Sequence, residues 1–203
     1  MSSSVALYNL EEYTFGIGAQ VKQHHSTDSS ARSERRRQRF VREGMRRSVR
    51  GVLLVHAKEH PHVLLLQRKE DGALRLPGGV LRPGEEDQAG LSRKLCAQLA
   101  SASIDQPQWD VGTFLGQLWR PTFDALDDDR NLYPYVAPHV SKPRENVKVF
   151  LVALPPKCVF AVPPAYQLLA IPLFELHNAQ DSAFPPDVLA LPLWLSRCEF
   201  MAM

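Results

Sequence analysis

Several features are scarce or missing in this 203-residue chain, and each excludes a class of protein. No run of about 18 apolar residues occurs, so no segment is expected to cross a membrane as a helix. The three cysteines are scattered and odd in number, which favours a reducing compartment and predicts no metal knuckle. The first residues have no basic stretch followed by a long apolar one, so we expect no secretory signal.

The remaining composition is that of a globular protein. Apolar residues make up 44% of the chain and charged residues 23%, enough for an ordinary buried core. The segments 49–56 and 62–67 contain continuous apolar runs, which suit strands covered on both faces of a sheet, and residues 58–61 fit the turn between them. Further segments are expected to continue the sheet: 109–119, 147–154, 159–163 and 166–174.

The two ends of the chain give weaker signals. Residues 1–30 look mostly irregular. Pro185 and Pro186 are expected to start a last helix that runs to about Phe200, and Pro192 would kink or shorten it.

Positive charge is concentrated in one segment. Residues 32–50 hold nine arginines and two glutamates, a local charge of +7, whereas the whole chain carries +2, so the remainder carries −5. This asymmetry suggests an anionic partner, and arginine favours bidentate contacts to phosphates and stacking on bases. Residues 31–44 are predicted to form a helix, and steps of four and three residues place one basic stripe there: Arg35, Arg39, Arg42 and Arg46. A merely solvated charged helix or a localisation signal is the alternative.

The segment 76–100 is the most distinctive part of the chain. Its Pro/Gly clusters at 77–79 and 82–84 predict two tight turns. Acidic residues at 85–87 follow, and they favour the start of a helix. Leucines at every fourth position predict a buried stripe on that helix: Leu91, Leu95 and Leu99.

This turn and helix resemble the Nudix box, whose helix carries the carboxylates that hold Mg²⁺ in Nudix hydrolases. Four positions match the family pattern: Gly79, Glu85, Arg93 and Leu95. Four depart from it, since three glutamates and the last glycine are replaced: Lys94, Ala97, Gln98 and Ala100.

The departures predict a Nudix scaffold without its metal site. Mg²⁺ requires hard oxygen ligands in octahedral geometry, and Lys94 places a positive charge where the dication would sit. We therefore expect no enzyme, no metal and no cofactor. An active Nudix pyrophosphohydrolase is the alternative, and it would need a displaced acid such as Glu86 or Asp87.

Over residues 7–200 the chain also resembles the small subunits of pre-mRNA cleavage factor I, also called cleavage and polyadenylation specificity factor subunit five. The resemblance rests on these segments: Tyr13-Thr14-Phe15-Gly16, Gly44-Met45-Arg46-Arg47-Ser48-Val49, residues 61–67, Leu76-Pro77-Gly78-Gly79, Trp119-Arg120-Pro121, Tyr133-Pro134-Tyr135 and residues 172–176.

The resemblance implies an α/β Nudix fold, an α/β/α sandwich with a mixed sheet. It divides the chain into an N-terminal extension (1–30), a Nudix-like domain (31–200) and a tail (201–203). It also implies a homodimer in the nucleus, a larger cleavage factor I subunit with an RNA-recognition domain as partner, and binding of the single-stranded RNA tetramer UGUA without metal or hydrolysis.

Carried over residue by residue, the family's RNA site falls on five positions: Arg32, Arg50, Ala73, Leu76 and Phe184. Arg32 and Leu76 match the family. Arg50 replaces a glutamate, Ala73 replaces a stacking phenylalanine, and Phe184 lies near a tyrosine contact, where it could still stack.

These replacements predict weaker RNA recognition, because base stacking contributes about 1–3 kcal/mol per base. We expect the fold, the dimer and the large-subunit contacts to be kept, with UGUA recognition weakened, altered or lost. Binding of RNA without sequence preference, and a pure interaction scaffold without RNA contact, are the alternatives.

Overall fold

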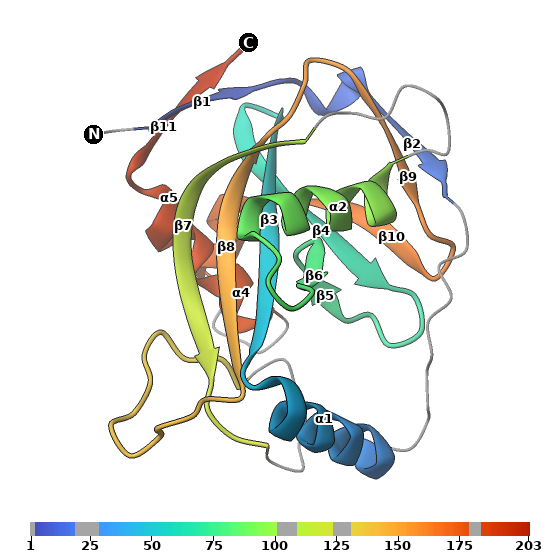
Figure 1. Cartoon of the computed structure of the whole chain (residues 1–203). Helices are drawn as coiled ribbons and strands as arrows, with labels where there is room; N and C mark the ends of the chain where they lie inside the picture. The colour runs from blue at the N-terminus through green and yellow to red at the C-terminus, as the bar shows by residue number, and fades with distance from the viewer. Residues whose placement is uncertain (1–2, 19–28, 101–108, 124–130, 179–183) are drawn as a thin grey trace.

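A computed structural model describes residues 3–18, 29–100, 109–123, 131–178 and 184–203 (Figure 1). Its centre is a seven-stranded mixed sheet in which β10, β4, β3, β8 and β7 follow one another, with β5 paired to β4 and β6 paired to β3. Only β3 and β8 pair in parallel within this described sheet; its other pairings are antiparallel. The strands are β3 (Arg46–Ala57), β4 (His60–Arg68), β5 (Leu74–Arg75), β6 (Gly78–Val80), β7 (Asp110–Arg120), β8 (Glu145–Ala153) and β10 (Tyr166–Pro172).

Helices cover both faces of this sheet, as β3 demonstrates. Its residues alternate between two apolar clusters, because successive side chains of a strand point to opposite faces. Val49 and Leu53 pack in the α2-side core beneath α2 (Asp87–Leu99), whereas Val52 and Leu54 pack in the α4–α5-side core. The second core is covered by three short helices: α3 (Leu173–Asn178), α4 (Pro186–Leu189) and α5 (Leu191–Leu195). The α/β/α expectation is confirmed.

The central elements agree with the sequence-based predictions. Helix α1 (Ser29–Glu43) and helix α2 form where the periodicity predicted them, and Leu91, Leu95 and Leu99 are all fully buried. The β3–β4 turn is tighter than predicted and consists of Lys58 and Glu59, whose φ angles are 46° and 64°. This two-residue turn suits the right-handed twist of paired strands. No helix among the described residues is long and apolar enough to cross a membrane.

The two chain ends differ from the predictions. Residues 3–17 are ordered as β1 (Ser3–Leu7), η1 (Leu10–Glu12) and β2 (Tyr13–Ile17), so the irregular description of this segment is wrong. β1 pairs in parallel with β11 (Cys198–Ala202), and β2 pairs in parallel with β9 (Cys158–Val162). Both pairings join segments far apart in sequence, which local patterns do not register.

The last helix begins at Pro186 as predicted, but its predicted continuation to about Phe200 is wrong. Pro192 lies in the first turn of α5 rather than at a kink, because a proline near a helix start loses no intrahelical hydrogen bond. The chain therefore makes two short helices, α4 and α5, and residues 198–202 then form β11 instead of continuing as helix.

Candidate functional site

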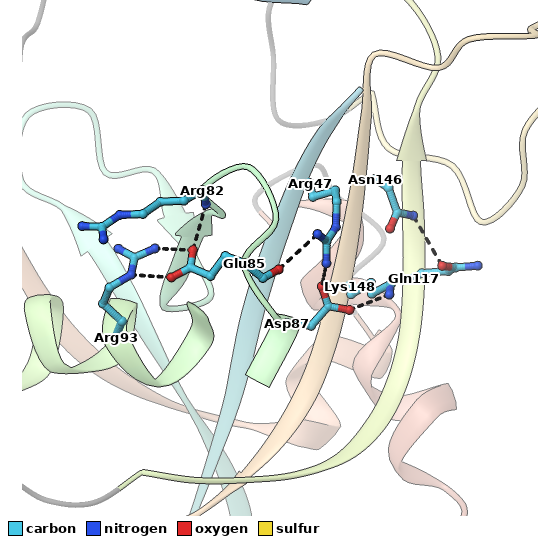
Figure 2. Close-up of polar contacts among 8 residues, drawn as sticks. All are labelled: Arg47, Arg82, Glu85, Asp87, Arg93, Gln117, Asn146 and Lys148. Atoms are coloured by element: carbon cyan, nitrogen blue, oxygen red, sulfur yellow. Dashed lines mark hydrogen bonds and ion pairs between the residues drawn. The ribbon is translucent and has the colours of Figure 1, made fainter. Parts of the chain in front are cut away.

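The two charged residues that match the Nudix box bind each other. Glu85 accepts hydrogen bonds from Arg93 Nε at 2.7 Å and from a terminal nitrogen of Arg93 at 2.6 Å, and it also accepts one from the backbone N–H of Arg82 at 2.8 Å (Figure 2). The bonds from Arg93, followed by the bond from Arg82, lower the pKa of Glu85 to about 2. Glu85 thus fastens the turn before α2 to the helix itself.

Two of the positions that depart from the box contact Gly78 and Gly79, just before this turn. The Gln98 side chain accepts a hydrogen bond from the backbone N–H of Gly78 at 2.9 Å and donates one to its carbonyl at 2.8 Å. Lys94 lies over Gly79, since a Cβ added there would be 3.3 Å from Lys94 Cδ and Cε. Burial, reinforced by the nearby charge of Arg93, lowers the pKa of Lys94. These are two of the positions at which the resemblance predicts that the metal-binding carboxylates are replaced.

Gly78 explains why the first predicted turn is replaced by a short strand. Residues 78–80 form β6 against β3, and Gly78 has a φ of +141°, a conformation that other residues rarely adopt. A Cβ at this position would lie 2.2 Å from the Val49 carbonyl oxygen. The second predicted turn is present, with Gly84 at a φ of +74°.

Asp87, one of the two candidate displaced acids, is held by two cations. Lys148 Nζ donates to its Oδ2 at 2.5 Å, and Arg47 donates to its Oδ1 (Figure 2). Burial raises the pKa of Asp87, but the bonds from Lys148 and Arg47 outweigh this effect and lower it. Within the described residues there is no group of three or more His, Cys, Asp or Glu residues placed to hold a metal.

Three of the five predicted RNA-binding residues lie around the start of α4. Leu76 is fully buried and Phe184 is partly buried, and both belong to the α4–α5-side core. Arg50, on β3, has a side chain only 14% exposed, and its Nε is 3.9 Å from Oδ2 of the buried Asp187. Asp187 follows the two prolines that open α4, and sequence reasoning missed it.

The other two predicted residues lie elsewhere. Ala73 is exposed in the β4–β5 connection, where its carbonyl accepts the N–H of Arg68 at 2.9 Å and its own N–H donates to Asp71 at 3.1 Å. Arg32 belongs to α1, but its side chain lies outside the described residues. The roles of the five residues in RNA binding stay predictions.

A cleft of about 580 Å³ opens between α1 and the turn 82–84, and sequence reasoning did not predict it. Six arginines and one glutamate line it: Arg36, Arg39, Arg46, Arg47, Arg82, Arg144 and Glu43. The predicted basic stripe is wrong at Arg46, which lies on β3 beyond the end of α1. Of the other three arginines in the stripe, only Arg39 lines this cleft. The concentration of arginine in residues 32–50 predicted the basic side that α1 contributes to the cleft. Arg82 and Arg144 come from distant segments, so the sequence did not indicate that they would join it.

A buried carboxylate anchors the cleft at the ends of three strands. Glu145 on β8 lies opposite Arg46 on β3 and Arg120 on β7. It is 2.5 Å from Arg46, 3.6 Å from Arg120 and 2.5 Å from the Ser48 hydroxyl. Burial raises the pKa of Glu145, but the charges of Arg46 and Arg120 and the bonds from Arg46 and Ser48 lower it to about 2.

Comparisons with known proteins place this geometry in a family. A Nudix family model, NUDIX_2, described as a nucleotide hydrolase, matches residues 3–198. Among solved structures, an Ap4A hydrolase from C. elegans superposes with a TM-score of 0.50 at 17% identity, covering 75% of this chain and 96% of that one, a likeness of fold alone.

Two relatives match along nearly the whole chain. The pre-mRNA cleavage factor Im 25 kDa subunit 2 of Arabidopsis thaliana is 41% identical over 201 residues, 98% of this chain and 96% of its own length. The cleavage and polyadenylation specificity factor subunit 5 of Dictyostelium discoideum is 32% identical over 200 residues, again 98% of this chain and 96% of its own. The chain therefore belongs to the family of Nudix-domain proteins that comprises the pre-mRNA cleavage factor Im 25 kDa subunits.

Proposed function

We propose that this protein is a non-catalytic subunit of the machinery that cleaves and polyadenylates mRNA 3′ ends, where it serves as an RNA-binding, homodimeric scaffold in the nucleus. The names of the relatives support the process, since the similarity covers nearly all of both chains. A larger cleavage factor subunit with an RNA-recognition domain is the partner that this role requires.

One observation carries the non-catalytic part of the proposal: three box positions and the displaced acid Asp87 make contacts that leave no room for a metal ion among carboxylates. Gln98 clamps the backbone of Gly78, and Lys94 covers Gly79. Glu85 is bound by Arg93, and Asp87 by Lys148 and Arg47. A dication placed here would be repelled by these lysines and arginines, and the two carboxylates are already bound to them. Mg²⁺ binding needs carboxylate oxygens that are free to coordinate the ion.

The expected weakening of UGUA recognition has support at two positions. The Arg50 side chain is only 14% exposed, and its Nε lies 3.9 Å from Asp187, so little of its guanidinium is presented to a base. Ala73 is exposed but has no ring on which a base could stack. RNA binding would then depend more on phosphate contacts, which weaken as salt rises.

The test is fluorescence-anisotropy binding of a UGUA-containing RNA and a scrambled RNA, at two salt concentrations and without Mg²⁺. We expect both to bind, with a small preference for UGUA and a loss of affinity in higher salt. Affinity for UGUA as high as that of a relative with the complete set of site residues, in matched salt, would contradict the weakening. If neither RNA binds, the RNA-binding part of the proposal fails and the protein acts only as a protein-interaction scaffold.

A second arm tests the absence of catalysis. The protein is incubated with Mg²⁺ and a dinucleoside polyphosphate, and released nucleotide is measured. Mg²⁺-dependent turnover that disappears in either Asp87→Asn or Glu86→Gln would overturn the non-catalytic assignment. Sedimentation of the full chain tests the homodimer.

A further inference from the structure

The arginine-lined cleft has two walls with different origins. Helix α1 supplies Arg36, Arg39 and Phe40, and the turn after β6 supplies Arg82. Arg46 and Arg47, at the start of β3, lie where the two walls meet. The local fold, rather than the sequence segment alone, therefore assembles the positive charge.

The inner arginines of the cleft make it strongly positive. Burial, together with the charges of Arg46 and Arg144 and against the opposing effect of Glu145, lowers the pKa of Arg36 to about 10. Arg46 and Arg47 each have a carboxylate partner, Glu145 and Asp87 respectively. The like charges gathered around a half-buried guanidinium produce a potential that attracts anions.

The outer arginines are available for a ligand. Arg39 is 66% exposed, and its contact to Glu43 is a loose one of 3.9 Å, which a phosphate can displace. Within the described part of the chain, the Arg82 guanidinium makes no hydrogen bond, and Figure 2 shows it directed away from Glu85. These two side chains flank the cleft from opposite walls.

Aromatic rings accompany the charges. Phe40 and Phe123 both line the cleft, with ring centroids 5.1 Å apart in an edge-to-face arrangement. The guanidinium carbon of Arg144 lies 5.1 Å from the centre of the Phe123 ring. Positive grooves that also present aromatic rings are the combination that binds single-stranded nucleic acid, since phosphates pair with the cations and bases stack on the rings.

We propose that this cleft is a second RNA-contact surface, which binds the phosphodiester backbone of single-stranded RNA outside the segment read at the predicted base-recognition positions. The inference rests on the proposed function. Its position supports it, because Arg36 follows the predicted RNA residue Arg32 by one turn of α1. Arginine favours such a ligand, since its planar fork binds phosphate oxygens bidentately.

The test compares two RNAs on the full chain: a UGUA-containing hexamer and a 20-mer with the same core. The double variant Arg39→Gln, Arg82→Gln removes both outer arginines, and Lys58→Gln, Lys157→Gln removes two exposed charges outside the cleft as a matched control. We expect the wild type to bind the 20-mer more tightly than the hexamer. The cleft variant should bind the 20-mer roughly tenfold more weakly, with hexamer affinity nearly unchanged.

The salt dependence gives a second readout. Loss of two phosphate contacts should reduce the slope of log affinity against log salt by about 1.4 for single-stranded RNA. The control variant should affect the affinities for the hexamer and the 20-mer by the same factor. Arg39→Lys, Arg82→Lys keeps the charge but not the bidentate geometry, so it should recover only part of the affinity.

The outcomes separate this inference from the proposed function. If the cleft variant still binds the 20-mer more tightly than the hexamer, by the same factor as the wild type, the cleft is not the second RNA surface. The proposed RNA binding itself would be unaffected by that result. Length-dependent binding that needs Arg39 and Arg82 but ignores UGUA supports the cleft and counts against base recognition. ATP binding that the variant abolishes, with no gain from RNA length, would show a small-phosphate site and overturn the inference. Absence of RNA binding at both lengths overturns both.

Discussion

Ala73 stands where the resemblance predicts the loss of a stacking phenylalanine. It is exposed, and its backbone bonds to Arg68 and Asp71 do not involve the side chain, so a larger residue fits without a change in the loop. We expect Ala73→Phe to bind UGUA RNA roughly 5- to 150-fold more tightly, because one stack contributes about 1–3 kcal/mol.

Fluorescence anisotropy with UGUA and scrambled RNAs measures this gain. Ala73→Leu is the matched control, since it adds apolar bulk without an aromatic face. Equal affinities of the phenylalanine and leucine variants would mean that no base stacks at this position.

Glu85 makes the stability of the turn before α2 depend on pH. Its pKa in the folded chain, about 2, lies below its ordinary value of 4.5, so folding favours the ionised form. The contribution of Glu85 is present above about pH 4.5 and is lost as the pH falls towards 2. Glu85→Gln should therefore destabilise the protein near neutral pH and have a shrinking effect in acid.

Urea unfolding of the wild type and Glu85→Gln at about pH 6 and about pH 3 measures this change. Glu86→Gln, an exposed change in the same loop, serves as the control. A difference in unfolding free energy that is the same at both pH values would show that the Arg93 pair is not the cause.

At the scale of elements, the short strand β6 depends on one glycine. Gly78→Ala would place a Cβ 2.2 Å from the Val49 carbonyl oxygen at a φ of +141°, and the backbone of β3 cannot yield without losing its pairing. We expect a loss of about 3 kcal/mol or more in the free energy of unfolding. Gly84→Ala has a φ of +74° but open space around it, and should cost only about 1 kcal/mol.

Denaturant unfolding of the two alanine variants makes the comparison. Similar losses in both would mean that backbone conformation, rather than the close approach to β3, sets the requirement for glycine at position 78.

Elements with a strong local period could be predicted from the sequence, and those made by distant pairing could not. The leucines of α2 and the apolar runs of β3 and β4 each lie within one segment, and each pattern predicts burial without knowledge of the partner segments. Val5 and Leu7 are also buried, yet β1 is short and its partner is β11, which no local pattern reveals.

The same division applies to the candidate sites. The box departures at Lys94 and Gln98 are visible in the sequence, but the clamp that Gln98 makes on Gly78 is not. The pair of Arg50 with Asp187 and the cleft wall formed by Arg82 exist only after the chain has folded, because they join segments without a shared pattern.

At the scale of the whole molecule, the two chain ends complete the core on the α4–α5 side. Leu7 in β1 is 2% exposed and packs in that core, whereas Ile17 in β2 is 85% exposed. Leu7→Ala should lower the free energy of unfolding by about 2–5 kcal/mol, and Ile17→Ala should change it by no more than about 0.5 kcal/mol. Thermal and denaturant unfolding check both values, and equal effects would mean that β1 adds nothing to the core.

The parallel pairing of β1 with β11 brings the first and last strands side by side at one end of the molecule, opposite α1 (Figure 1). During synthesis, β1 leaves the ribosome long before its partner β11, because most of the described chain lies between them. The central sheet can form while β1 is still unpaired, because contacts between distant segments form late. Closure of this two-stranded sheet is therefore expected to be the last step of folding, and a nascent chain stalled before Cys198 would keep the edge of β1 open to other strands.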